Sequence, residues 1–534
     1  MKRRSTFGAA TVGAVALVAL LAGCTGMTPD PTPSPTGTPE SRYQPGAAGI
    51  GDPYYPLDGN GGYDVGHYDL ELAYEPETGE LAGRAVISAT ATQDLSRFDL
   101  DLDGLMVTRV TVDDVDADFT TESFDISAAT GQPVDEPEGD EPGAADGSDE
   151  DGAAGAEGDG LADPGRTELI VTPAAGIDEG TDFTVAVEYG GVPATIDDTF
   201  GYGGVIRTAD GAVIVGQPRV AATWFPANDH PADKATFRIR MSVPEGLQAI
   251  SNGRLAGAVT ADGRTDWEWV MDEPMATYLA TATVGDFAVS TLSQDGIDYW
   301  NAVGSGLFDE QAVEATGQSY GDLADQAFAR GPEITAFLAS RFGPYPFTES
   351  GGIAVNVDDL DYALENQTRP IYGPWVFEGP EGLSTVVHEL AHQWFGDSVS
   401  IAAWSDIWLN ESFATYAEWL WSEDQGGQTA QQIFDFLDDQ PASDPFWGLE
   451  IGDPGPAHVF DEAVYNRGAM TLHALRLKLG DEVFFSAVKS WAAENAYGTV
   501  STDDFIAHVE KASGSDLGDF FDTWLYTGSK PTST

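Results

Sequence analysis

The chain has 534 residues, of which 42% are hydrophobic and 11% aromatic. It can therefore bury a sizeable core and is long enough for two or three domains. It has 24 basic and 88 acidic residues, which give a formal net charge of -64 at pH 7. Such a charge repels nucleic acid and anionic lipid head groups, so we expect no nucleic-acid partner. The favoured interpretation is a solvated surface that resists aggregation.

Residues 1–23 have the pattern of a secretory signal peptide, with three basic residues before an apolar run at residues 7–21. Residues 21–24, Leu-Ala-Gly-Cys, resemble the lipobox of bacterial lipoproteins, in which cleavage precedes a cysteine that is then acylated. We therefore predict lipidation at Cys24 and an extracytoplasmic protein anchored to the bacterial cell membrane, with the export route left open. The alternative is an uncleaved anchor or a plain secretory signal.

Residues 24–60 are rich in proline, threonine and glycine. This composition favours extended conformations and buries no core, so we predict a tether. Residues 61–288 consist of short alternating runs, such as residues 67–72 and 84–89, separated by Gly, Asp and Pro. Half-buried strands have this pattern, which predicts a β-rich N-terminal domain.

An acidic segment at residues 133–165 interrupts the predicted β domain. It contains no basic and no aromatic residue, and consists mostly of Asp, Glu, Gly, Ala and Pro. Such a composition cannot offset the entropy of ordering, so we predict a disordered loop between two strands. Calcium binding is the alternative, although the spacing of the carboxylates fits no EF-hand loop.

From residue 289 to residue 534 the hydrophobic period becomes mainly helical. Residues 320–342 and 471–479 are alanine-rich helical segments, and residues 352–357 form the main strand. We therefore predict an α+β multidomain chain, in which a β-rich N-terminal domain precedes a mainly helical domain.

The clearest chemical motif is His-Glu-x-x-His at His388, Glu389 and His392, in a segment with helical periodicity. The four-residue spacing puts both imidazoles on one helix face, where they can bind one Zn²⁺. Glu389 is then placed to take a proton from an attacking water. Because Cys24 is the only cysteine, further zinc ligands must be histidine or carboxylate. The alternative is a helix whose histidines are satisfied polar residues.

A second apolar helix, predicted to start near residue 405, contains a candidate third ligand, Glu411. Eighteen residues separate it from His392. Two histidines and one glutamate leave the fourth zinc position open, as a catalytic site requires. A carboxylate among apolar neighbours also needs a partner, and we expect one Zn²⁺ per chain.

These residues, together with Asn410, resemble the aminopeptidase N family of gluzincin metallopeptidases, and the similarity extends over most of the chain. The resemblance implies a saddle-like β-sandwich followed by a thermolysin-like catalytic domain. It also implies removal of N-terminal residues from peptides with a free N-terminus. Residues 524–531 resemble the close of the catalytic domain, which implies a short form without the C-terminal helical domain of longer relatives.

The resemblance also assigns substrate-binding residues. Residues 362–366, Tyr-Ala-Leu-Glu-Asn, stand where the family has Gly-x-Met-Glu-Asn, so Glu365 corresponds to the carboxylate that binds the substrate α-amino group. Gln217 corresponds to a second amine-binding position. Tyr465 corresponds to a tyrosine whose phenol donates a hydrogen bond to the developing oxyanion. From the residues alone, the alternatives are that Glu365 is a charge at a strand end, that Gln217 is a turn residue and that Tyr465 is a buried tyrosine.

The leading hypothesis is thus a zinc aminopeptidase. A thermolysin-like zinc endopeptidase is the alternative, because it needs the same metal ligands but neither Glu365 nor Gln217. A third possibility is a peptide-binding lipoprotein without catalysis. The sequence establishes neither the preferred N-terminal residue nor the oligomeric state.

Overall fold

The computed structural model describes residues 42–124, 166–198, 200–309, 311–313, 317–379 and 382–532. Tyr43–Thr534 forms one compact unit. The predicted signal peptide, Cys24 and the predicted acidic loop at residues 133–165 lie outside the described residues. No helix in the described ranges combines the length and the apolar character needed to cross a membrane.

The first part of this unit consists of strands and two short 3₁₀ helices. The strands are β1 Gln44–Pro45, β2 Tyr63–Glu75, β3 Glu80–Ala91, β4 Leu95–Asp101, β5 Met106–Val112, β6 Val115–Asp116, β7 Asp118–Phe124, β8 Arg166–Thr172, β9 Asp182–Gly191, β10 Thr195–Asp198, β11 Gly201–Arg207, β12 Ala212–Val215, β13 Lys234–Pro244, β14 Gln248–Ser251, β15 Arg254–Ala261, β16 Arg264–Ala276 and β17 Ala282–Gly285; the 3₁₀ helices are η1 Ala221–Thr223 and η2 Thr277–Leu279.

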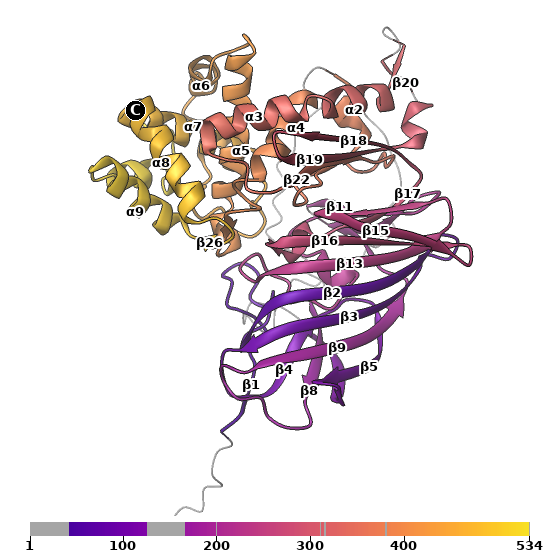
Figure 1. The fold of residues 1–534 in the computed structure, drawn as a ribbon. Coiled ribbons are helices and arrows are strands. Elements are labelled where there is room, and N and C mark those ends of the chain that lie inside the picture. The colour runs from indigo at the N-terminus through magenta and orange to yellow at the C-terminus, as the bar shows by residue number, and fades with distance from the viewer. Residues whose placement is uncertain are drawn as a thin grey trace, which may run out of the picture. The chain divides into compact units, whose positions relative to one another are not determined.

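These strands form three sheets (Figure 1). The largest has the order β15-β16-β13-β2-β3-β9-β5-β6, and the others have the orders β1-β4-β8-β7 and β10-β11-β12-β17-β14. Burial alternates along β2, because successive side chains of a strand point to opposite faces. One face of the large sheet therefore packs into the core, as the alternating sequence predicts.

The second part combines a small sheet with the helices. The strands are β18 Phe287–Gln294, β19 Ile297–Gly304, β20 Gln311–Val313, β21 Gln318–Ser319, β22 Glu349–Ala354, β23 Ala363–Leu364, β24 Ile371–Tyr372, β25 Ser400–Ile401 and β26 Thr499–Val500; the helices are α2 Tyr320–Phe328, α3 Gly331–Phe342, α4 Gly382–His392, α5 Trp408–Asp424, α6 Ala430–Asp438, α7 Glu462–Leu479, α8 Asp481–Glu494, α9 Thr502–Ser513 and α10 Gly518–Leu525, with the 3₁₀ helices η3 Ser305–Phe308, η4 Pro374–Phe377, η5 Trp404–Asp406 and η6 Pro445–Trp447.

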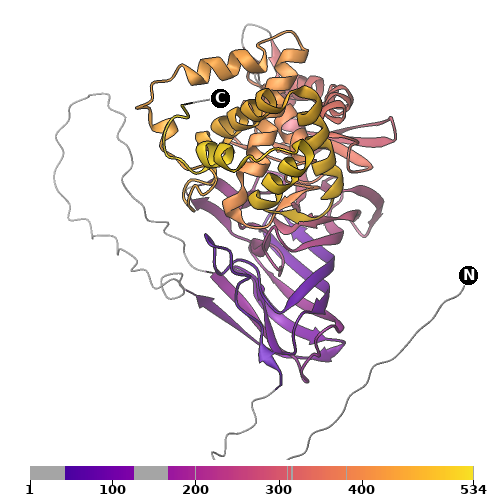
Figure 2. The ribbon, with the colours of Figure 1, turned by 90° about the vertical axis from the view of Figure 1, so that its left-hand side faces the viewer.

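The helices gather on one side of the unit and the large sheet on the other (Figures 1 and 2). Helix α5 packs against both α4 and α7. The small sheet has the order β18-β19-β22-β24-β23, so β23 is an edge strand. The predicted α+β class, with a β-rich first part and a helical second part, is confirmed.

Three details differ from the sequence prediction. The tether predicted over residues 24–60 is wrong for the described residues 42–60, because Tyr55 and Leu57 are buried in the core and β1 pairs with β4. Strands continue to Gly304, because β18 and β19 pair with each other and β19 pairs with β22. The helix predicted over residues 320–342 is two helices, α2 and α3, with Pro332 in the first turn of the second. Proline has no amide hydrogen to continue a helix, but fits its first turn.

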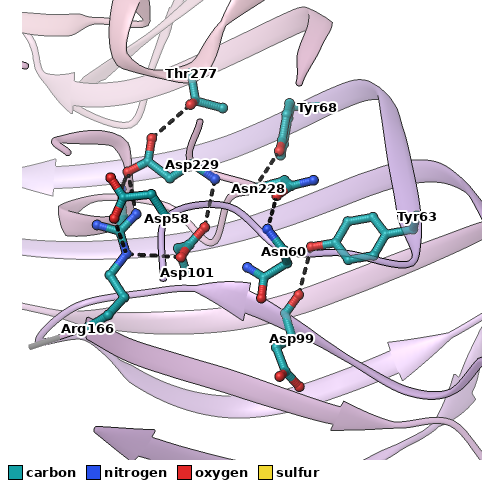
Figure 3. Close-up of polar contacts among 11 residues, drawn as sticks. Asp58, Asn60, Tyr63, Tyr68, Asp99, Asp101, Arg166, Asn228, Asp229 and Thr277 are labelled. Atoms are coloured by element: carbon teal, nitrogen blue, oxygen red, sulfur yellow. Dashed lines mark hydrogen bonds and ion pairs between the residues drawn. The ribbon is translucent and has the colours of Figure 1, made fainter. Parts of the chain in front are cut away.

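A buried charged cluster lies where β4 and β8 pair (Figure 3). The Arg166 guanidinium donates hydrogen bonds to Asp101 Oδ1 at 3.0 Å and to Asp229 Oδ2 at 3.2 Å. Glu168 is the cross-strand partner of Asp101 and is fully buried. Burial and the negative charge of Asp101 raise the pKa of Glu168 to about 10, so this carboxyl keeps its proton at neutral pH.

The two parts also contact each other directly. Lys234, the first residue of β13, donates from Nζ to the carbonyl oxygens of Asp397 at 2.7 Å and Ser398 at 3.0 Å. These carbonyls follow the end of α4. The large sheet therefore helps to fix the segment that leaves the helix bearing the His-Glu-x-x-His motif.

Candidate active site

Helix α4 presents the motif residues on one face. Its apolar side chains Val387 and Leu390 are buried, which holds the helix in the core. The ring centroids of His388 and His392 lie 4.8 Å apart, one turn along the helix, as the i, i+4 spacing predicts. Glu389 is 5% exposed and lies between them in sequence.

Helix α5 brings Glu411 to both histidines. Its Oε2 lies 3.3 Å from the Nε2 atoms of His388 and His392. One ligand atom from each of the three residues lies within 4.8 Å of the others. The helix begins at Trp408, whereas the sequence predicts a start near residue 405, where the short helix η5 lies instead.

The outer ring nitrogens fix how the two histidines face the site. His388 Nδ1 lies 2.7 Å from Glu418 Oε1, and His392 Nδ1 lies 3.0 Å from the carbonyl oxygen of Phe395. Each Nδ1 therefore bears a hydrogen, and each Nε2 faces Glu411. This arrangement of two Nε2 atoms and one carboxylate fits Zn²⁺ with an open fourth position.

The electrostatics of the group favour positive charge. Burial alone would lower the pKa of His392, but the charges of Glu411 and Glu365 raise it to about 9. Burial would raise the pKa of Glu411, but the charge of His392 and the hydrogen bonds from both histidines lower it to about 2. The site therefore stabilises a cation, as a divalent metal requires.

Glu389 has a different environment from Glu411. Burial, reinforced by the neighbouring carboxylates Glu365 and Glu411, raises its pKa to about 8, although the two histidines oppose the shift. One of its oxygens lies within 4.8 Å of ligand atoms from Glu365 and His392. A buried carboxylate with this pKa can accept and release a proton near neutral pH.

Glu365 follows the edge strand β23 and is 2% exposed. Tyr278 donates its hydroxyl to Glu365 Oε1 at 2.8 Å, and Gln393 donates to the Glu365 carbonyl at 3.1 Å. Gln217 lines a cavity that Glu365 and the two histidines also line, and its buried Oε1 has no hydrogen-bond partner among the described residues. Both groups are therefore acceptors that an ammonium group could reach.

Tyr465 lies in the first turn of α7 and stacks on His388, with ring centroids 5.9 Å apart and planes inclined by 22°. Burial, and then the charges of Glu411 and Glu365, raise the pKa of Tyr465 well above its usual value. The phenol therefore stays protonated and remains a hydrogen-bond donor.

All seven candidate residues of the catalytic region line one cavity of about 240 Å³. The sequence predictions for it are His388, Glu389, His392, Glu411, Glu365, Gln217 and Tyr465, and the further lining residues are Asp361, Tyr362, Ala363, Trp375, Thr385 and Glu418. The structure thus brings together residues that are up to 248 positions apart, from Gln217 to Tyr465.

The departure from the family motif at Tyr362 has a structural consequence. Its hydroxyl donates to the carbonyl oxygen of Tyr202 on β11 at 3.1 Å. A Cβ on Gly203 or on Gly216 would lie 3.2 Å from this hydroxyl oxygen. The two glycines therefore leave room for the tyrosine, which forms part of the cavity wall.

Sequence reasoning missed Glu418 and Asp361. Glu418 binds His388 and also accepts a hydrogen bond from Ser384 Oγ at 2.5 Å. Its one sequence signal is its position two helical turns beyond Glu411, on the same face of α5. Asp361 lies four residues before Glu365 and has no such signal.

Two family patterns match the sequence: the peptidase family M1 domain over residues 381–524, and the peptidase M1 N-terminal domain over residues 168–279. Aminopeptidase M1 of Arabidopsis thaliana is 30% identical over 338 residues, which are 59% of this chain and 36% of that protein. Aminopeptidase N of Streptomyces lividans is 28% identical over 340 residues, which are 57% of this chain and 36% of that protein. The chain thus spans little more than a third of the length of these relatives.

Solved structures are similar over more of their length. An M1 zinc metallopeptidase from Deinococcus radiodurans superposes with a TM-score of 0.72 at 25% identity, covering 91% of this chain and 100% of that chain. A mutant M1 zinc metallopeptidase from the same organism, bound to a Tyr-Ser-Ala substrate, gives a TM-score of 0.71 at 26% identity, with the same coverage. Residues 168–279 and 381–524 of this chain are therefore similar to the N-terminal domain and the peptidase domain of the M1 peptidase family.

Proposed function

We propose that this protein is a zinc aminopeptidase, which hydrolyses the N-terminal residue from peptides. The observation that supports this function is the position of Glu365. Its buried carboxylate lies beside Glu389 and His392, within 4.8 Å between ligand atoms. None of the described residues that line the cavity is Lys or Arg. A peptide α-ammonium group is the partner that this carboxylate suits.

The residues divide the reaction between them. His388, His392 and Glu411 would hold Zn²⁺, which supplies Lewis acidity toward the scissile carbonyl and the attacking water. Glu389 acts as general base, taking a proton from that water and returning it to the leaving amine. The Tyr465 phenol donates a hydrogen bond to the developing oxyanion.

Glu365 and Gln217 fix the substrate by its free N-terminus. An ion pair and a hydrogen bond to the α-ammonium group place the first peptide bond, and no later one, over Glu389. A thermolysin-like endopeptidase would need neither residue.

The test compares one peptide with a free N-terminus and the same peptide after N-acetylation. We expect cleavage of the free peptide, loss of that cleavage with a chelator, and its return with added zinc. We expect the acetylated peptide to be cleaved at least ~100-fold more slowly, because it has no ammonium group for the buried Glu365 carboxylate. Equal rates on both peptides would establish an endopeptidase instead, and a chain that cleaves neither peptide would support the non-catalytic alternative.

We also propose that Cys24 is acylated and anchors the protein on the outer side of a bacterial cell membrane. The lipobox-like residues 21–24 support this location. In bacteria that express the full chain, wild-type protein should sediment with membranes, whereas a Cys24→Ser variant should not. Membrane association of the Cys24→Ser variant equal to wild type would rule out the lipid anchor.

A further inference from the structure

The wall of the active-site cavity contains one carboxylate that the proposed reaction does not use. Five carboxylate residues line the cavity, and four have partners or roles already described: Glu365, Glu389, Glu411 and Glu418. The fifth is Asp361, which is exposed to solvent. Within the described part of the chain, Asp361 forms no hydrogen bond and no ion pair.

We infer that Asp361 selects peptides whose first residue has a long cationic side chain, lysine or arginine. This inference rests on the proposed aminopeptidase function and names the substrate class of the same site. Asp361 and Glu365 are four residues apart, so their Cα atoms are at most about 14 Å apart. A first residue whose α-amino group binds Glu365 can therefore extend its side chain toward Asp361.

Two other residues that line the cavity suit the stem of such a side chain. Trp375 lines the same cavity and is 40% exposed, although it is a large apolar residue. An exposed indole face packs against methylene groups and attracts an ammonium or guanidinium group. Ala363, on the edge strand β23, adds a small apolar surface to this wall.

The charge of the cavity also opposes the alternatives. No described lining residue is Lys or Arg, so the side chain of an N-terminal Asp or Glu would be repelled by Asp361 without a Lys or Arg to pair with. A neutral first residue such as methionine would leave Asp361 solvated, so Asp361 would change the free energy of binding of that substrate little. Asp361 therefore favours lysine and arginine over other first residues, whereas the catalytic residues make no such distinction.

The test measures kcat/KM for chromogenic substrates with N-terminal lysine, arginine, methionine and aspartate. Methionine resembles lysine in length but has no charge, so the lysine-to-methionine ratio isolates the contribution of the cation. We expect this ratio to exceed one in the wild type and to fall about fivefold in an Asp361→Asn variant, the size of a partly exposed ion pair. The wild-type ratio should also decrease as ionic strength rises.

An Asp359→Asn variant is the matched control, because Asp359 is an exposed aspartate two residues away that does not line the cavity. It should keep the wild-type ratio. The inference is overturned if Asp361→Asn lowers the lysine and methionine rates equally, or if Asp359→Asn changes the ratio as much. In both cases cleavage of the methionine substrate still supports the proposed function, whereas absence of turnover on every free-amine substrate would refute both.

Discussion

Glu418 illustrates how a residue outside the metal-binding group can govern it. It accepts the Nδ1 hydrogen of His388, and its second oxygen accepts a hydrogen bond from Ser384 at the start of α4. The carboxylate therefore holds the His388 ring in one orientation and increases the basicity of Nε2. Removing its charge should weaken metal binding without removing a ligand.

We predict that Glu418→Gln lowers zinc affinity about 10- to 100-fold, the usual cost of losing such a hydrogen-bonded carboxylate. The measurement is competition for zinc against a chromogenic chelator. Glu482→Gln is the control, because Glu482 is an exposed acid in the first turn of α8. Equal zinc affinity in the wild type and Glu418→Gln would show that Glu418 does not support His388.

The predictability of each site residue depends on how far apart its partners lie in the sequence. His388, Glu389 and His392 are predictable because one helical turn relates them. Assigning Glu365, Gln217 and Tyr465 required a family resemblance, since no local spacing connects them with the histidines. Glu418 and Asp361 were not predicted, because their proximity to the site follows from the packing of α5 on α4 and from the path of the chain before β23.

At the scale of elements, the hydrophobic periodicity predicted which regions consist of strands and which of helices. It did not predict where the β domain and the individual helices end. Strand β18 crosses the predicted end of the β domain at residue 288 and β19 lies beyond it, because β18 pairs with β19 and β19 pairs with β22 of the helical half. Pairing between distant segments has no signal in a local window. The division between α2 and α3 did have a signal, Pro332, which the periodicity of the alanine-rich segment outweighed.

The pairing of β4 with β8 has a consequence for stability. It buries Asp101 opposite Glu168, and only one of the pair can be ionised at low cost. Glu168 therefore retains a proton that it would lose at about pH 4.3 in the unfolded chain. Between that pH and its folded pKa of about 10, the folded chain binds more protons than the unfolded chain.

Stability should therefore decrease as the pH rises through this window. We predict that a Glu168→Gln variant, which is neutral at every pH, loses less stability than the wild type between mildly acidic and mildly alkaline pH. Urea unfolding midpoints with zinc present throughout would measure this. Identical slopes of midpoint against pH would show that Glu168 has the same proton affinity in the folded and unfolded chains.

At the scale of the whole molecule, the net charge of -64 and the active-site cavity both favour the binding of cations. A strongly negative protein attracts cations over a distance set by the ionic strength. Zinc and the ammonium group of the proposed peptide substrate are both cations, so the field of the protein favours their approach. Composition alone could not identify these ligands, since an acidic surface also serves solubility.

The residues that line the active-site cavity come from parts of the chain that lie far apart in the sequence. The metal ligands, Glu389 and Tyr465 all fall within residues 381–524, the segment that matches the peptidase pattern. Gln217 lies in the N-terminal domain, and Asp361 and Glu365 lie in neither matched segment. A comparison of relatives limited to the peptidase segment therefore includes the residues proposed to bind zinc and to break the bond, but not Gln217, Asp361 or Glu365. On the proposed function, the residues that select the peptide end and the first residue lie outside this segment, so they can differ between proteins that have the same metal ligands.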